Sequence, residues 1–167
     1  MISWVELPLE VSHLLNPAFC GLMLHKAVDS YCAERNEAMP FPLSYLVLPI
    51  VLHEETRRVL PPAKTTTMHL WLQRYPQARV GFALRATRFV EFTSEGLRFL
   101  FAHGNLLLVN GGGASLRPSA RGPVGGKALS ELGPEVRECI RAAGLVGRWF
   151  ANCGTPWTAF ALWGIRP

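Results

Sequence analysis

A glycine-rich run with a lysine, residues 122–127, is the first place in this sequence where chemistry could be expected. Backbone amides of such a run, together with a lysine, hold phosphate in nucleotide-binding loops. That motif requires glycine where Arg121 stands and a hydroxyl side chain where Ala128 stands, and no buried strand precedes the run. The pattern therefore does not predict a nucleotide site.

Two other groups of reactive residues lack the geometry that catalysis or metal binding needs. His53, Glu54 and Glu55 are consecutive, so on a helix their side chains point in different directions and cannot share a metal ion. Ser115 has no flanking glycines and precedes a strand, unlike the nucleophile of a hydrolase. The cysteines show no paired spacing and fall in apolar patterns: Cys20, Cys32, Cys139 and Cys153. The sequence predicts buried thiols, and no catalytic residue, metal site or cofactor.

Positive charge is concentrated in one block of the chain. The protein has 17 Lys and Arg against 12 Asp and Glu, for a net charge of +5. Residues 1–56 are acidic, whereas residues 57–127 hold eleven basic side chains and only Glu91 and Glu95 as acidic ones. A basic block of this kind suits a phosphate backbone or an acidic protein.

Apolar residues at helical spacing predict the elements that carry this block. Asn16 followed by Pro17 predicts a helix start, and the apolar period continues to about Glu34. A buried segment follows that Pro49 should kink or split, then a short helix over 53–60. Further helices are expected over 68–75, 77–87, 94–103, 134–152 and 156–164, with a hairpin of strands 106–109 and 114–117.

Three short helices followed by a hairpin are typical of the winged helix-turn-helix plan. We therefore expect a mainly α, compact helical domain that contains a winged helix-turn-helix-like unit with one β-hairpin. The expected parts of this single unit are an apolar helical region 1–62, a winged-helix-like region 65–118, a flexible loop 119–133 and C-terminal helices 134–167.

The basic block leaves two kinds of partner open, nucleic acid and protein, besides the plain alternative that the arginines only keep the module soluble. Phe99 lies beside a glutamate on the outer face of the third expected helix, which suits a protein partner better than a DNA groove. A free-standing winged-helix DNA-binding regulator is the alternative to a docking subunit.

Several longer segments resemble the middle component of bacterial three-component ABC systems, which are related to Lamassu-type anti-phage defence. The resemblance rests on residues 16–20, on 40–43 with 46–53, and on 147–150 with 164–167, and it covers nearly the whole chain. It implies a non-enzymatic adaptor that links an SMC/Rad50-like ABC ATPase to an effector, such as a nuclease or another toxic domain. Contact with double-stranded DNA would be auxiliary and independent of sequence.

Candidate contact residues follow from these two lines of reasoning. The residues expected to meet DNA phosphates are Arg85, Arg88, Arg98, Arg117, Arg121 and Lys127. The residues expected to contact a protein partner are Phe99, Trp157, Phe160 and Trp163. For the three on the last helix, core packing is the competing interpretation.

The N-terminal sequence and the hydropathy pattern predict a cytoplasmic protein with no contact to a membrane. No basic residue precedes Lys26, so the start of the chain lacks the charged region of a signal peptide. The longest strongly apolar run, 38–52, contains three prolines and is shorter than the about 20 apolar residues that a spanning helix needs.

Overall fold

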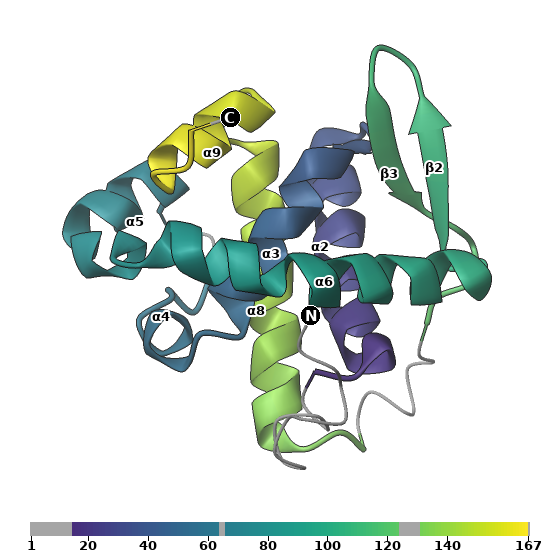
Figure 1. Ribbon diagram of the computed structural model, residues 1–167, viewed down its shortest axis with the longest axis horizontal. Coiled ribbons are helices and arrows are strands. Elements are labelled where there is room, and N and C mark those ends of the chain that lie inside the picture. The colour runs from purple at the N-terminus through teal and green to yellow at the C-terminus, as the bar shows by residue number, and fades with distance from the viewer. Residues whose placement is uncertain (1–14, 64–65, 124–130, 167) are drawn as a thin grey trace.

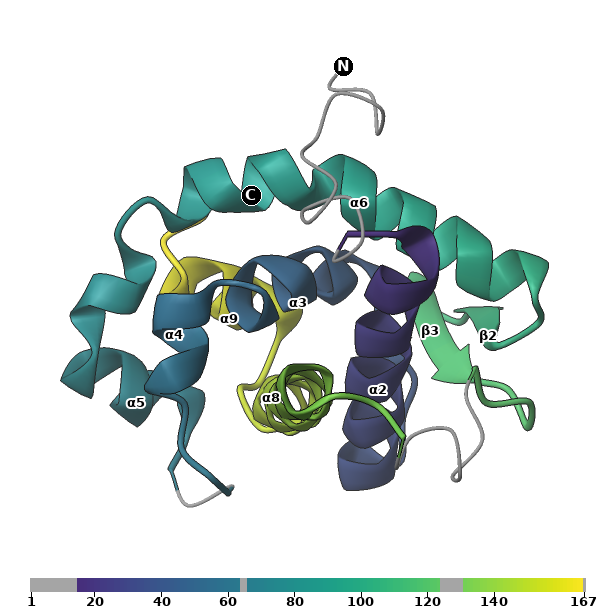
Figure 2. The ribbon, with the colours of Figure 1, turned by 90° about the horizontal axis from the view of Figure 1, so that it is seen from below.

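The protein is a layered helical domain with a small sheet at one end (Figure 1). The computed structural model describes residues 15–63, 66–123 and 131–166. Its helices are α2 (Pro17–Arg35), α3 (Ser44–Val51), α4 (Glu54–Arg58), α5 (Met68–Arg74), α6 (Phe82–Ala102), α8 (Pro134–Ala151) and α9 (Pro156–Leu162), with 3-10 turns η2 (Phe41–Leu43) and η3 (Pro76–Arg79). Figure 2 shows α6 lying across one side of the molecule and α8 on the other, with α3 between them.

The helices begin where the sequence predicts caps. The side chain of Asn16 accepts a hydrogen bond from the Phe19 N–H at 2.8 Å, and Pro17 occupies the first helical position of α2. Thr155 accepts from the Thr158 N–H at 3.3 Å and starts α9 in the same way. The predicted helices at 17–34, 134–152 and 156–164 are confirmed within one or two residues.

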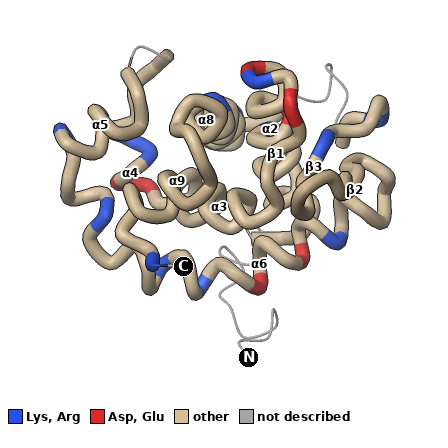
Figure 3. Tube along the Cα trace, turned by 90° about the horizontal axis from the view of Figure 1, so that it is seen from above, with Lys and Arg blue, Asp and Glu red and all other residues tan. Residues whose placement is uncertain are grey.

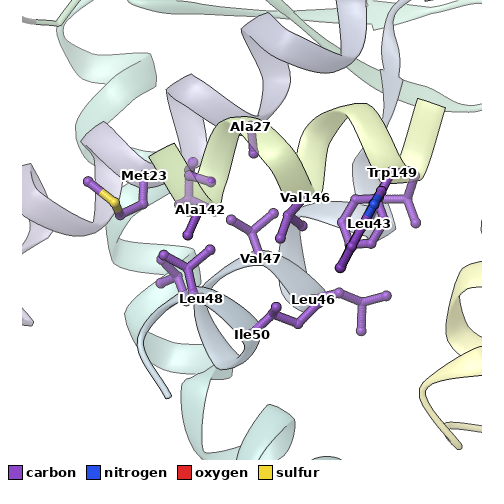
Figure 4. Close-up of a cluster of buried hydrophobic side chains, with 14 of the residues drawn as sticks. Met23, Ala27, Leu43, Leu46, Val47, Leu48, Ile50, Ala142, Val146 and Trp149 are labelled. Atoms are coloured by element: carbon purple, nitrogen blue, oxygen red, sulfur yellow. The ribbon is translucent and has the colours of Figure 1, made fainter. Parts of the chain in front are cut away.

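The core is formed where α2, α3 and α8 meet. Side chains from all three helices point into one cluster, among them Met23, Val47 and Val146, which are fully buried (Figure 4). The α2–α8 contact is close enough to need glycine, because a Cβ on Gly147 would overlap the carbonyl oxygen of Ala27 and lie 3.0 Å from its carbonyl carbon. This crossing fixes the centre of the fold.

Pro49 lies inside α3, as the sequence predicts, and the apolar segment divides just after it. Proline lacks an N–H and weakens the turn that contains it. The helix ends at Val51, and His53 then caps α4 by accepting from the Thr56 N–H at 3.4 Å. Two helices therefore replace one, and their junction lies against α6 and α8.

The expected break between helices 77–87 and 94–103 is absent, because residues 82–102 form the single helix α6. Thr93, whose residue type is common at helix starts, is a fully buried residue in the middle of α6. Residues 76–79 form the 3-10 turn η3 instead of a helical turn. The helix-turn-helix arrangement expected in 65–118 thus lacks its second turn, although the hairpin follows the helix directly as predicted.

The predicted hairpin is confirmed and is joined by a third strand. Strands β2 (Leu106–Asn110) and β3 (Ala114–Pro118) are antiparallel, with Leu108 opposite Leu116. The two-residue strand β1 (Met39–Pro40) pairs with the other side of β3, so the strand order is β1-β3-β2. The mainly helical fold with one hairpin is therefore confirmed, with β1 as an addition that the sequence did not indicate.

Candidate functional site

The three arginines predicted on α6 do not form a basic stripe. Arg88 and Arg98 are exposed, but on a helix they share the outer face with Glu91 and Glu95. Arg98 is also bound to Glu95 in an ion pair. The tube in Figure 3 shows two acidic positions between basic ones along this helix, so its outer face carries little net charge.

The Arg85 side chain forms hydrogen bonds within the protein. Its Nε donates to the carbonyl oxygen of Pro49 at 3.0 Å, and a terminal nitrogen donates to that of Ala78 at 3.2 Å. The guanidinium also lies over the ring of Phe82, 5.2 Å from its centroid. Burial lowers the pKa of Arg85. These bonds hold η3 and the end of α3 against α6, and they occupy donors that a phosphate would need.

Arg117 and Arg121 lie on a different part of the molecule. Arg117 is exposed on β3 and Arg121 is exposed just after the hairpin. The segment from His103 to Arg121 contains no Asp or Glu, so these two arginines form the most consistently basic part of the described chain near the sheet. Lys127 lies outside the described residues, as do the other residues of 124–130 in the loop expected to be flexible, 119–133.

The four aromatic residues predicted to bind a partner differ in exposure. Trp157 is 61% exposed on α9, whereas Trp163 is 1% exposed and packs on Phe82 with ring centroids 4.4 Å apart. Trp163 is thus a core residue with no surface to offer a partner. Phe160 is half-buried, and Phe99 is half-buried and stacks on His103 at 4.1 Å.

A run of three consecutive exposed apolar side chains lies on β2, which the sequence analysis did not select. Leu107 and Leu108 are 51% and 52% exposed, and Val109 follows at 39%. In Figure 1 the hairpin projects past the ends of the neighbouring helices, so the residues toward its tip have no helix behind them. The run of four apolar residues that begins at Leu106 was the sequence signal for this exposed apolar surface. In a hairpin with one buried face, apolar and polar residues would alternate along the strand.

A groove between α5, α8 and α9 is the other notable surface feature. Its volume is about 570 Å³, and it combines an apolar floor with a polar rim. It is lined by Thr66, Thr67, Met68, His69, Trp149, Asn152, Cys153, Thr158 and Leu162. The Trp149 indole N–H donates to the Thr66 carbonyl oxygen at 2.9 Å, so this donor is already used by the protein.

The thiols are poorly suited to nucleophilic chemistry. Burial raises the pKa of Cys20 to about 12 and also raises the pKa of Cys139 and Cys153. A thiol reacts through its thiolate, which such residues scarcely populate at neutral pH. Among residues 15–63, 66–123 and 131–166 there is also no cluster of three His, Cys, Asp or Glu residues that could hold a metal ion.

Comparison with known proteins assigns the chain to a family. The model of the ABC-three component (ABC-3C) system Middle Component 3 family matches residues 4–167. The chain belongs to this family. No curated protein and no solved structure gave a significant match. In the described part of the chain, no helix is long and apolar enough to cross a membrane.

Proposed function

We propose that this chain is a non-catalytic adaptor that links an SMC/Rad50-like ABC ATPase to an effector, a nuclease or another toxic domain. The proposal extends to Lamassu-type anti-phage defence in the cytoplasm. The main support for this proposal is the family match over residues 4–167, because a middle component is named as one of the three components of such a system. Exposed apolar side chains on β2 and on α9 support it, because such residues are typical of protein contacts.

The chemistry of the described residues is consistent with a binding role. The charged residues on α6 are paired or balanced, and Arg85 and Arg57 donate to backbone carbonyl oxygens of α3. Arg57 is 6% exposed and bonds to the Val51 carbonyl oxygen at 2.9 Å and to Glu135 at 3.3 Å. These side chains hold elements of the fold in place.

Co-expression with the ATPase component and the effector component of the same system tests the adaptor function. We expect a complex of all three chains on size exclusion, and loss of contact between ATPase and effector when this chain is omitted. An ATPase and effector that associate equally well without it would contradict the proposal. Turnover of a substrate by the isolated chain would contradict its non-catalytic part.

Auxiliary DNA contact is the second candidate, and Arg117 and Arg121 are the observation in its favour. Both are exposed in a segment without acidic residues. Arg88, Arg98 and Lys127 complete the candidate set, whereas Arg85 is committed to Pro49 and Ala78. A free-standing winged-helix regulator is less well supported, because α6 is continuous and offers no separate recognition helix.

The salt dependence of duplex binding separates these possibilities. Phosphate contacts make log affinity fall linearly with log salt, and loss of one contact reduces the slope by about 1. The double substitution Arg117→Gln with Arg121→Gln should therefore lower both affinity and slope, for any DNA sequence. No binding at low salt by either the chain or its complex would remove DNA contact from the proposal.

A further inference from the structure

We propose that the free edge of β2 accepts an extended segment of a partner protein of the three-component system, one that carries apolar and acidic residues, as an added antiparallel or parallel strand. The inference rests on the adaptor function proposed above and deepens it by naming the contact. It starts from the strand order β1-β3-β2, which leaves β2 at the edge of the sheet among the described residues.

The backbone register shows which groups are available on that edge. Antiparallel pairs alternate between residues that exchange hydrogen bonds and residues that do not. The Ser119 N–H donates to the Asn105 carbonyl oxygen at 3.0 Å and the Gly111 N–H to that of Gly113 at 3.5 Å, which places hydrogen-bonded pairs at the odd-numbered residues of β2. The N–H and C=O groups of Leu108 and Asn110 therefore point away from β3.

β2 also lacks the features that usually protect an edge strand. Protected edges carry a proline, a charged side chain, a bulge or a covering element. Residues 106–110 read Leu-Leu-Leu-Val-Asn, with no proline or charge, and pair with β3 in an unbroken register. Asn110 and the three residues before it are exposed. This strand combines an apolar sequence with an open backbone edge, and an exposed edge is what strand addition requires.

The side chains around the edge define the chemistry of the added segment. Leu107 and Val109 lie on one face of the sheet, and Arg117, directly opposite Leu107, shares that face. An added strand would lie about 10 Å from β3, a gap that an arginine and a glutamate can span together. Because no acidic residue lies between His103 and Arg121, the complementary segment presents apolar side chains to Leu107 and Val109 and a carboxylate toward Arg117.

Amide hydrogen exchange on the full chain, alone and in complex with the ATPase and effector components, tests the contact at single residues. In the free chain the amides of Leu108 and Asn110 should exchange fast and those of Leu107 and Val109 slowly. In the complex we expect the exchange of Leu108 and Asn110 to slow at least about tenfold, as newly formed hydrogen bonds require.

The outcomes distinguish this inference from the function on which it rests. A stable complex in which the amides of Leu108 and Asn110 exchange unchanged would overturn the strand addition and leave the adaptor function intact. Failure of the chain to bind either component would overturn both.

Matched substitutions provide a second measurement. Leu108→Lys places a charge on the edge strand, and we expect it to weaken the complex about tenfold, because charged side chains on an edge oppose the addition of a strand. Leu84→Lys is the control, because Leu84 is 58% exposed and lies near the start of α6, whereas the sheet follows the other end of this helix (Figure 1). Arg117→Glu should weaken the complex as well, whereas Arg88→Glu should not. Equal effects of Leu108→Lys and Leu84→Lys would contradict the proposal.

Two other occupants of the edge would also contradict it. If a second copy of this chain pairs with β2, light scattering of the isolated chain will show a mass that doubles with concentration, together with protection of Leu108 and Asn110. If DNA covers the edge, a duplex added at low salt will give the same protection without any protein partner. Either result would replace the acidic segment as the occupant.

Discussion

Glycine has different roles in two regions of the molecule, the crossing of α2 with α8 and the β2–β3 hairpin. At the crossing, a Cβ on Gly147 would meet the backbone of Ala27, whereas a Cβ added at Gly111, Gly112 or Gly113 at the hairpin tip would meet nothing within 4 Å. In the first region glycine permits close packing of two helices. In the second it permits a turn, with positive φ at Gly112 and Gly113. Stability should therefore depend on the crossing, and the hairpin is left free for contact.

Gly147→Ala should have the largest effect on stability. The added methyl group overlaps backbone atoms of Ala27, which cannot move aside as a flexible side chain can. We expect a loss of more than about 3 kcal/mol in the free energy of unfolding, at the upper end of what overpacking costs. Urea denaturation followed by circular dichroism measures this loss.

Gly144→Ala on the same helix is the matched control. Its methyl group would meet only the ends of the Lys26 and Ser30 side chains, at 3.2 and 3.3 Å. Since alanine is favoured over glycine in a helix by about 1 kcal/mol, this variant should be neutral or slightly more stable. Equal destabilisation by both substitutions would show that the crossing is not the point of close contact.

Arg85→Ala should have the next largest effect. It leaves the carbonyl oxygen of Pro49 without its donor at the end of α3 and removes the cation from the ring of Phe82. We expect a loss of about 1–3 kcal/mol, the usual result of leaving a partly buried polar group unsatisfied. Thermal unfolding beside the exposed Arg88→Ala variant measures the difference, and a loss at Arg88 equal to that at Arg85 would contradict it.

Acidification should lower the free energy of unfolding by less than the Gly147 and Arg85 substitutions do. Burial lowers the pKa of both His25 and His53 below 6.5, and Arg85 adds to the shift at His53. The unfolded chain then binds more protons than the folded one, so stability falls as the pH drops from about 7 to about 5.

His53→Asn tests the contribution of the α4 cap to this pH dependence. Asparagine can still accept from the Thr56 N–H and does not titrate. The variant should therefore lose less stability on acidification than the parent chain does, as measured by urea unfolding at several pH values. An unchanged pH dependence would show that His53 contributes nothing to it.

Leu108→Ser should have the smallest effect on folding. The side chain is half exposed on a projecting strand, so we expect a change within about 0.5 kcal/mol in the free energy of unfolding. A loss comparable to that of Gly147→Ala would remove the contrast between the two regions.

Local sequence signals predicted the elements that begin with strong caps. Asn16 with Pro17 and Thr155 with Pro156 gave the starts of α2 and α9, because these residues act on the first turn alone. The break predicted in α6 was wrong for a related reason. Thr93 has the residue type of a cap, yet the apolar positions Phe82, Ala86, Phe89, Thr93, Leu97 and Leu100 continue one helical face through it. Packing along the whole face outweighed the local preference.

Features that depend on distant partners could not be predicted. Pairing of Met39 with Leu116 joins residues far apart in the chain, and a two-residue strand has no pattern of its own. The count of basic residues suggested a single basic surface. Arg85 instead points inward and donates to the carbonyl oxygen of Pro49, which lies near the end of α3. The exposure of Leu108 follows from how far the hairpin projects, which depends on the helices beneath it.

The short strand β1 has a consequence for assembly. It pairs with β3 at Leu116, and Pro118 has no N–H to offer, so the outer side of β3 is closed to a further strand along most of its length. Among the described residues, β2 is therefore the edge with room for a longer added strand. If β2 accepts a donated strand as proposed, each chain takes up one donor, without the end-to-end growth into fibres that a sheet open on both sides would allow.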